Sequence, residues 1–559
     1  MKKRWLVIVF LVAALLAGSV PPLVAAPSGR GISLRIGSLE ADAGGKAVTL
    51  DAAPFIQDGR TFVPLRFVSE ALGASVQYTQ KADGSTEKVT VDFGGLAPFQ
   101  TWTIGVAEVD LGGEVVALDA APLVRDSRTF VPVRFVAEAM GGRLQVVANP
   151  DGSTGQVLIQ LPLSQKERDL VKPLANGFSD FGFRLMRQVA AEQTGKNIFL
   201  SPLSAALALS MTAQGAKGDT FKAMAASLGL SDFSSASSGG EKLAQAASLL
   251  MESLAAMDPE QVTLEIANAL FANRQVPFEE DFLARCQESY QAEVNSLDFA
   301  DPSTLQAIND WARQKTHGRI DGILDQLEPQ DVMVLLNAIY FLGRWSRPFP
   351  ADQTREADFT LSDGSTVQVP RMGQDGEFEY LEGEGFQAIR LPYASSSLNL
   401  PGSDRLSMAV LLPERGTSLE QFLAMLDGDQ WRSWMESMAG RKGRIELPRF
   451  RVEFKTSLKD ALIAIGMGAA FDPDLADFSG MASLPAWISD VIQKTFVEVK
   501  ETGTEAAAVT AVVMKATGMM EPPPPPFQMI VDRPFLFAIT DRETGALLFL
   551  GSIQNPAGS

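Results

Sequence analysis

Hydrophobic and polar positions alternate with two different periods along this chain. Residues 67–72 place their apolar side chains on one helical face, and Gly73 stands where a glycine ends a helix. Residues 89–93 instead alternate strictly, as a half-buried strand does. From residue 176 onward, long amphipathic helices are mixed with strands. This mixture predicts an α+β domain.

The N-terminal part of the chain contains an internal repeat. The sequence DAAP at residues 51–54 and the sequence RTFVP at residues 60–64 both return 68 positions later. A constant offset over a whole unit indicates duplicated structural modules. We therefore expect two small α+β repeats over residues 31–95 and 99–163, followed by a linker over residues 164–175.

The repeats carry the motif APxxxxxRTFVPxRFVxEAxG and through it resemble the N-terminal stalk domain of copper amine oxidases. The resemblance does not imply oxidase chemistry, because the copper site of that enzyme belongs to another domain and this stretch has no histidine. It implies either a module that binds a cell-wall or matrix partner, or a plain spacer. Both interpretations stay open on the sequence.

The first 26 residues have the pattern of an export signal. Basic residues at positions 2–4 precede an apolar run over residues 5–17, and Ala25 and Ala26 offer a cleavage point. The alternative is a retained membrane anchor, which the shortness of the run disfavours. We expect an extracellular protein, secreted or held at the cell surface, with no membrane span after cleavage.

Charge and rare residues exclude several classes of function. The 48 basic and 67 acidic residues give a net charge of −19, which disfavours nucleic acid and anionic membranes as partners. The single cysteine, Cys286, excludes an internal disulfide and is expected to be a buried small hydrophobe. The single histidine, His317, precedes Gly318 at an expected helix end, where it would cap carbonyls. We expect a monomer with no metal, no cofactor and no catalytic residue.

The most informative segment lies near the C-terminus. Residues 506–514 contain no proline, glycine or charge, and their side chains are small or favour strands. They follow an alternating strand pattern at 491–499 and precede five prolines at 522–526, where an exposed connection is expected. A long connection whose residues favour strands can itself add to a sheet as a further strand. The alternative is an ordinary buried strand before a proline-rich turn.

Motifs in the same order over residues 176–556 resemble the serpin family of protease inhibitors. The sequence GTEAAA at 503–508 resembles the hinge of the serpin reactive-centre loop, and residues 488–499 resemble the strand before it. NIFLSPLS at 197–204 resembles the shutter, and NAIYFLGRW at 337–345 resembles the breach. The resemblance implies the α+β serpin fold for the domain that we place at residues 176–557. That fold has three β-sheets with surrounding helices and an exposed reactive-centre loop.

The resemblance also implies a mechanism. A serpin is a suicide inhibitor of serine, and in some cases cysteine, endopeptidases: the loop is cut, the acyl-enzyme is trapped, and the loop inserts into the central sheet. The alternatives are a non-inhibitory serpin, or a cell-surface binding or structural protein. The small hinge residues favour inhibition. The implied hinge is Gly503, Thr504, Glu505, Ala506, Ala507, Ala508, Val509 and Thr510. The implied shutter and breach residues are Ser201, Ser204, Asn337, Trp345, Gln493, Arg449 and Glu501. Of these, Glu501 and Arg449 match positions that pair at the top of the sheet in relatives.

Counting along the loop in the family manner places the scissile bond between Thr517 and Gly518. A small residue there suits an elastase- or subtilisin-like protease. The neighbouring pairs Lys515 with Ala516 and Met519 with Met520 are the alternatives, for trypsin- and chymotrypsin-like targets.

This chain departs from the family at Gln493, where many serpins carry a shutter histidine. An amide can still hydrogen-bond to Ser201 and Asn337, but it does not titrate near neutral pH.

Overall fold

The computed structural model describes residues 31–558, except 72, 94–98, 114, 140–141, 150–152, 234–238, 256–261, 320–321, 395–403 and 505–524. The expected export signal, the hinge from Glu505 onward and every candidate scissile bond therefore lie outside the described residues. Within the described part, no helix has the length and apolar character needed to cross a membrane.

The N-terminal module is built from two equivalent sets of elements. The first repeat supplies β1 (Gly31–Arg35), β2 (Glu40–Ala43), β3 (Lys46–Thr49), β4 (Phe55–Gln57), β5 (Arg60–Pro64), α1 (Leu65–Ala71), β6 (Ser75–Gln80) and β7 (Thr86–Asp92). The second supplies β8 (Gln100–Thr103), β9 (Glu108–Leu111), β10 (Val115–Ala117), β11 (Leu123–Arg125), β12 (Arg128–Pro132), α2 (Val133–Ala139), β13 (Arg143–Ala148) and β14 (Thr154–Gln160). The helix expected near residue 70 and the strand expected near residue 90 are both present.

The two repeats are interleaved. One sheet has the order β13-β14-β1-β2-β3 and another the order β10-β9-β8-β7-β6, so each joins a hairpin of one repeat to three strands of the other. A third sheet, β11-β12-β5-β4, takes two strands from each. The fully buried Trp102 of the second repeat belongs to a single core to which both repeats contribute.

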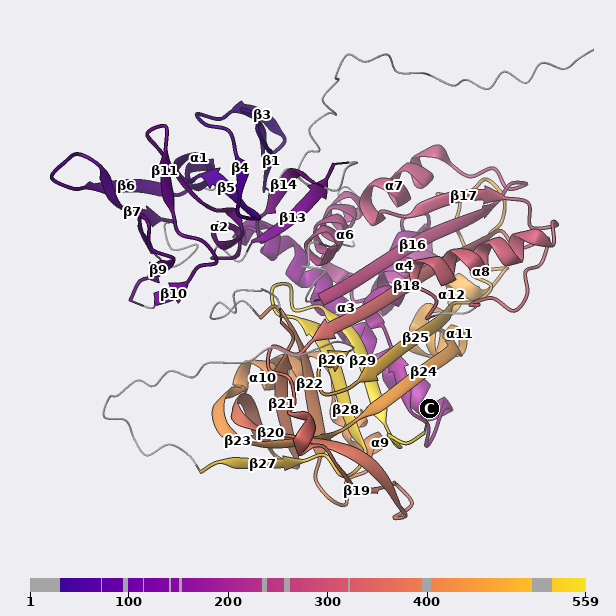
Figure 1. Cartoon of the computed structure of the whole chain (residues 1–559). Helices are drawn as coiled ribbons and strands as arrows, with labels where there is room; N and C mark the ends of the chain where they lie inside the picture. Colours follow the sequence, from indigo (N-terminus) through magenta and orange to yellow (C-terminus); the bar gives the residue numbers. More distant parts are fainter. Residues whose placement is uncertain are drawn as a thin grey trace, which may run out of the picture.

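The larger body contains helices around three further sheets (Figure 1). The helices are α3 (Gln165–Glu192), α4 (Pro202–Ala213), α5 (Gly218–Ser227), α6 (Gly239–Ala255), α7 (Glu280–Tyr290), α8 (Ser303–Lys315), α9 (Leu419–Met425), α10 (Gly428–Ser437), α11 (Lys459–Leu462) and α12 (Gly468–Phe471). Short turns of other helix types are η2 (Ser231–Phe233), η3 (Ala351–Gln353) and η4 (Ile463–Met467).

The largest sheet has nine strands in the order β15-β29-β28-β22-β21-β20-β23-β27, with β19 paired to β20. Its strands are β15 (Ile198–Leu200), β19 (Arg355–Thr360), β20 (Thr366–Gly383), β21 (Phe386–Pro392), β22 (Leu406–Pro413), β23 (Ala439–Pro448), β27 (Phe527–Ile530), β28 (Phe535–Asp541) and β29 (Leu547–Ile553).

The other two sheets lie side by side. One has the order β17-β16-β18-β26, formed by β16 (Val262–Asn273), β17 (Glu293–Leu297), β18 (Met333–Arg344) and β26 (Gly503–Thr504). The other pairs β24 (Phe450–Ser457) with β25 (Ile492–Val499). Strands β18 and β25 are neighbours, yet among the described residues no ladder of hydrogen bonds joins them. We call the boundary between them the split.

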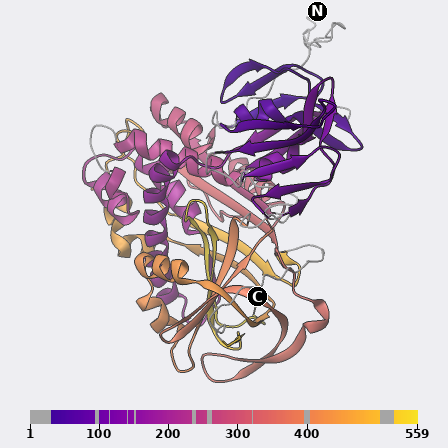
Figure 2. The ribbon, with the colours of Figure 1, turned by 90° about the vertical axis from the view of Figure 1, so that its left-hand side faces the viewer.

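The module lies next to the larger body (Figure 2) and touches it through β13 and Leu163. The expected linker at 164–175 is wrong: Ser164 caps α3, and residues 165–175 form its first turns, with Val171 and Leu174 buried in the main core. Arg143 Nη1 donates to the carbonyl oxygen of Ser253, at the end of α6, over 3.4 Å. The amide nitrogen of Leu163 donates to Glu543 Oε1 over 2.6 Å.

Candidate functional site

The upper end of the split is where the expected hinge begins. Gly503 lies opposite Arg344, and Thr504 lies opposite Gly343, in an antiparallel pair between β26 and β18. Gly503 has a φ of +125°, and a Cβ atom there would stand 2.2 Å from the carbonyl oxygen of Gly343. Only glycine fits this close approach and this backbone conformation. The first two residues of the expected hinge therefore form a short strand paired to β18.

Trp345, one of the expected breach residues, holds the chain that leads into β26. Its indole stacks on the ring of Tyr393, with centroids 4.6 Å apart. Its Nε1 donates to the carbonyl oxygen of Lys500 over 2.9 Å, and its backbone nitrogen donates to the carbonyl oxygen of Thr502 over 3.2 Å. Because the indole is buried, this turn has one defined position.

The expected pair of Arg449 and Glu501 lies beside Trp345. Arg449 Nε donates to Glu501 Oε1 over 2.8 Å, and Arg449 Nη2 donates to the same oxygen. Thr354 Oγ1 donates to this oxygen as well, over 2.5 Å. Burial alone would raise the pKa of the Glu501 carboxyl, but the hydrogen bonds from Arg449 and Thr354 outweigh burial and hold that pKa below its usual value. Sequence reasoning missed Thr354, because nothing local marks a partner so far from Glu501 in the chain.

The expected shutter residues meet below the split. Gln493 Oε1 accepts a hydrogen bond from the Ser201 nitrogen, and Gln493 Nε2 donates to the Ser201 carbonyl oxygen, each over 2.9 Å. Ser201 Oγ donates to the carbonyl oxygen of Leu548 over 2.8 Å and accepts from the nitrogen of Ser204 over 3.3 Å. The Gln493 amide thus bonds to the main chain of Ser201. The side chain of Asn337 lies outside the described residues.

A cavity of about 610 Å³ opens at the lower end of the split, where β18 and β25 begin. Its wall includes Met333 and Leu335 from β18, Ile492 from β25, and Leu324 and Leu327 from the segment between α8 and β18. The split is therefore held at its top by the breach contacts and is hollow at its base.

Cys286 and His317 were expected to have structural roles. The Cys286 thiol is buried in α7, and burial raises its pKa to about 12, so it is a poor nucleophile. His317 lies in the turn after α8 with a φ of +50°, and the nitrogen of Gly318 donates to the carbonyl oxygen of Arg313. The expected helix end is present at this place.

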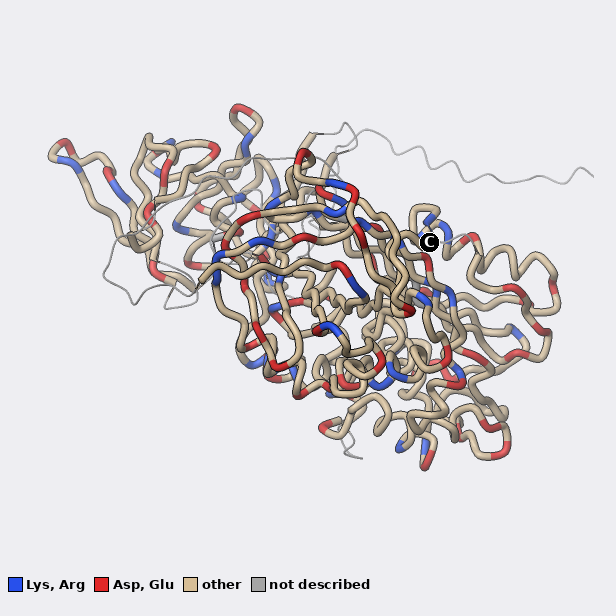
Figure 3. The backbone as a smooth tube through the Cα atoms, turned by 90° about the horizontal axis from the view of Figure 1, so that it is seen from below, with Lys and Arg blue, Asp and Glu red and all other residues tan. Residues whose placement is uncertain are grey.

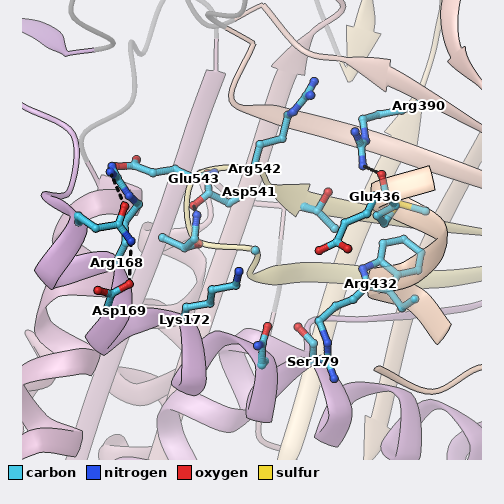
Figure 4. A pocket seen from close by; sticks show the side chains of 17 residues that line it. Arg168, Asp169, Lys172, Ser179, Arg390, Arg432, Glu436, Asp541, Arg542 and Glu543 are labelled. Carbon is cyan, nitrogen blue, oxygen red and sulfur yellow. Dashed lines mark hydrogen bonds between the residues drawn. The ribbon is translucent and has the colours of Figure 1, made fainter. Parts of the chain in front are cut away.

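A second cavity, of about 460 Å³, lies between α3, α10 and the turn after β28 (Figure 4). Its labelled charged side chains are Arg168, Asp169, Lys172, Arg390, Arg432, Glu436, Asp541, Arg542 and Glu543. Elsewhere, basic and acidic residues are interspersed along the described chain (Figure 3).

Two family models match the chain. The model described as "Serpin (serine protease inhibitor)" matches residues 176–556, and the model described as "Copper amine oxidase N-terminal domain" matches residues 23–91 and 81–159. An uncharacterized serpin-like protein of Thermococcus kodakarensis is 36% identical over 388 residues, which cover 69% of this chain and 86% of that protein. Human serpin B8 is 36% identical over 395 residues, covering 68% of this chain and 98% of that protein.

Solved structures give the same result. Human thyroxine-binding globulin in complex with thyroxine superposes with a TM-score of 0.60 at 28% identity, covering 69% of this chain and 99% of that one. The thermophilic serpin tengpin, in its native state, superposes with a TM-score of 0.59 at 29% identity, covering 74% of this chain and all of that one.

Proposed function

This chain belongs to the serpin family, and we propose that it is a secreted or cell-surface suicide inhibitor of serine endopeptidases. A target protease cuts the loop that follows β26 and becomes acylated. The freed loop then enters the split between β18 and β25, and the attached protease is distorted before it can hydrolyse the ester. The inhibitor supplies no catalytic residue of its own in this scheme.

The observation that carries the proposal is the register of β26 on β18. Continuing the pairing of Thr504 with Gly343 would bring Ala506 opposite Phe341 and Met514 opposite Met333, the first residue of β18. Lys515, the first charged residue after Glu505, would fall just beyond the strand. The uncharged run at 506–514 therefore matches the length of β18 that is available to an entering strand.

The same register assigns a side to each loop residue. Residues directly opposite each other in a sheet point to the same face. Phe341 and Ile339 point into the main core, so Ala506 and Ala508, their partners in the extended register, would become buried there. Glu505 would face the opposite side of the sheet. The small residues thus coincide with the positions where a large or charged side chain would obstruct insertion.

The test compares Ala506→Arg with Glu505→Arg. We expect Ala506→Arg to turn the protein into a substrate that is cut without forming SDS-stable complexes, because an unpaired guanidinium would have to enter the core. Glu505→Arg, which places the same group on the outer face one residue earlier, should keep complex formation. Equal loss in both variants would contradict the register, and a wild-type protein that forms no complex with any serine protease would refute inhibition.

We further propose that the scissile bond joins Thr517 and Gly518, with elastase- and subtilisin-like proteases as targets. The neighbouring bonds after Lys515 and Met519 are the alternatives. Mass spectrometry of the fragment released from each complex identifies the bond. A cut outside residues 515–520 would contradict this assignment.

A carrier function is the second candidate, favoured by the cavity between α3 and α10 and by the likeness to a hormone-binding serpin. Its mixed charged lining would suit a small zwitterionic or anionic molecule. Small amphipathic carboxylates should then raise the melting temperature of wild-type protein but not of Lys172→Glu. A non-inhibitory carrier would also show no SDS-stable complex, which separates the two candidates.

A further inference from the structure

The connection between the N-terminal module and the larger body is short and pinned at both ends. Strand β14 ends at Gln160 and helix α3 begins at Gln165, so residues 161–164 alone join the two. Leu161 packs against the core of the module, and Leu163 is buried in the main core. The module therefore cannot turn freely about this connection.

A polar network next to Leu163 fixes the module further. The Leu163 nitrogen donates to Glu543 Oε1 over 2.6 Å, and Glu543 Oε2 pairs with Arg405 Nη1 over 2.8 Å. Arg405 Nη2 in turn donates to Oδ2 of the fully buried Asp541 over 2.9 Å. Because hydrogen bonds to buried charged groups are directional and costly to leave unmade, this network favours one orientation of the module.

The module is fixed at the end of the larger body from which the expected loop departs. Gln160 Nε2 donates to the carbonyl oxygen of Glu252, near the end of α6, over 3.4 Å. The next described strand, β16, begins at Val262 opposite Gly343 of β18, and Gly343 also lies opposite Thr504 of β26. In Figure 1 the module, β26 and β27 all lie on the left-hand side, whereas α8 and α12 lie on the right. A protease held by the loop between β26 and β27 therefore approaches on the side where the module lies.

The hairpin of β9 and β10 is the part of the module that lies toward that end. Figure 1 shows β9 and β10 at the lower edge of the module, toward β26 and β27, and β3 at its upper edge. Strand β10 is the edge strand of its sheet, so no described strand covers its outer side. Val115, the first residue of β10, is 50% exposed. An edge strand with an exposed apolar side chain is available to contact another protein.

We propose that the module forms part of the surface on which the target protease docks, with the hairpin of β9 and β10 against that protease. The inference rests on the proposed inhibitory function, which brings a serine protease to the loop beside the module. The protease would present its active-site cleft to the loop and a neighbouring surface to β10. The module then selects among proteases that cut the same loop sequence, because one whose surface clashes with the hairpin docks more slowly.

The internal repeat supplies a matched control for the test. Val115 of β10 corresponds to Ala47 of β3, 68 positions earlier, and both side chains are exposed. Val115→Cys and Ala47→Cys each add one reactive thiol to the full-length protein, because the native Cys286 is buried and burial raises its pKa to about 12. A thiol-reactive label can therefore be attached at either position alone. Since both positions lie on the surface, the two variants should melt at the same temperature as wild type.

The first measurement uses a photocrosslinking label and an elastase-like protease whose catalytic serine is replaced by alanine, so that the protease docks on the loop without cutting it. We expect the label on Val115→Cys to crosslink to this protease and the label on Ala47→Cys not to. The second measurement uses the active protease and a long polyethylene glycol chain as the label. The chain on Val115→Cys should slow formation of the SDS-stable complex about fivefold or more, and the chain on Ala47→Cys should slow it less than about twofold.

The outcomes separate this proposal from the inhibitory function on which it rests. Crosslinking at neither position, or to the same extent at both, overturns the proposal if SDS-stable complexes still form. Equal slowing by the polymer at the two positions overturns it as well, and inhibition again stands. If no SDS-stable complex forms with any serine protease, the inhibitory function itself fails.

Discussion

Strands pair in different ways in the N-terminal module and at the split of the larger body. In the module, β1 pairs with β14 and β7 with β8, so each repeat completes a sheet begun by the other. In the larger body, β18 and β25 are adjacent, but the described residues show no ladder between them. One region pairs strands across its two repeats, and the other leaves two neighbouring strands without a ladder among the described residues.

The difference teaches that neighbouring strands without a ladder between them are positioned by contacts at their ends and from other elements. The module needs none beyond its shared core. At the top of the split, Trp345 after β18 donates to the carbonyl oxygen of Lys500 after β25. On the β25 side, Glu501 pairs with Arg449, and Gln493 bonds to Ser201 before α4. These contacts are polar, local and few. Under the proposed function, an entering strand would have to displace the contact at the top of the split.

The largest expected effect comes from breaking the interleaving. Trp102→Ala removes a fully buried side chain whose ring meets Phe135 edge to face at 5.0 Å. We expect the module to lose about 3–5 kcal/mol of stability, and both repeats to unfold together. Hydrogen exchange should show β6 and β7 of the first repeat losing protection along with the second. Phe99→Ala, at a half-exposed position, is the control and should change little. Independent unfolding of one repeat would contradict a shared core.

The next largest effect is expected from removing the Gln493 amide, which bonds to Ser201 at the shutter. Gln493→Leu keeps the side-chain volume but leaves the Ser201 nitrogen and carbonyl oxygen without their side-chain partner. We expect a loss of about 2–4 kcal/mol and faster conversion to inserted or polymeric forms. Gln493→Glu can accept from the Ser201 nitrogen but repels the Ser201 carbonyl oxygen. Its stability should therefore lie between that of wild type and that of Gln493→Leu. A variant as stable as wild type in urea would show that the amide does not support the split.

A smaller effect is expected at the breach. Glu501→Lys replaces the partner of Arg449 with a like charge, which favours opening at the top of the split. Since Arg449 is half exposed, the pair itself contributes about 1 kcal/mol. We expect polymers on a native gel after mild heating. Glu498→Lys makes the same charge change nearby and should leave the monomer intact; polymers from both variants would assign the effect to net charge.

The breach also predicts a pH dependence with a definite sign. The folded-state pKa of Glu501 is depressed, so its stabilising effect is complete above the usual glutamate value of about 4.3. That effect is lost as the pH falls through the lower, folded-state pKa. The difference in urea midpoint between wild type and Glu501→Gln should therefore be present at pH 6 and shrink toward zero in acid. A difference that grows in acid would contradict the assignment.

The smallest effect concerns the reciprocal ion pairs between the repeats. Arg60 Nε lies 2.5 Å from Asp119 Oδ2, and Arg128 Nε lies 2.5 Å from Asp51 Oδ2. Because all four side chains are partly exposed, a double-mutant cycle on either pair should give about 0.2–1 kcal/mol. The two cycles should agree, since the pairs are equivalent by the repeat. A large difference between them would show that the interleaving is asymmetric.

The sequence predicts elements of this protein better than their partners. The repeat offset and the alternation at residues 89–93 predict β7, but the same alternation is satisfied whether β7 pairs within its repeat or with β8. The interleaving was therefore not visible. The strand expected at 491–499 is present as β25, whereas the absence of a described ladder to β18 depends on contacts far apart in the chain.

In the candidate site, too, the sequence predicts residues better than their partners. Arg449 and Glu501 were paired through the family resemblance, and the structure brings them together. Thr354 completes that cluster from a third segment, with no signal in its own neighbourhood. His317 was placed correctly at a helix end, but Glu265 lies 52 positions away, so its carboxylate contact had no local signature. The hinge beyond Thr504 and the scissile bond stay predictions.

The exchange of strands between the repeats also has a consequence for biosynthesis. The first repeat leaves the ribosome before its complement has been made, and β1 waits for β14, more than a hundred residues later. Until then, the edge of β1 that pairs with β14 has no partner strand. A chain that ended between the repeats would contain only the first repeat. Its β1 could pair with a β14 strand only from another molecule.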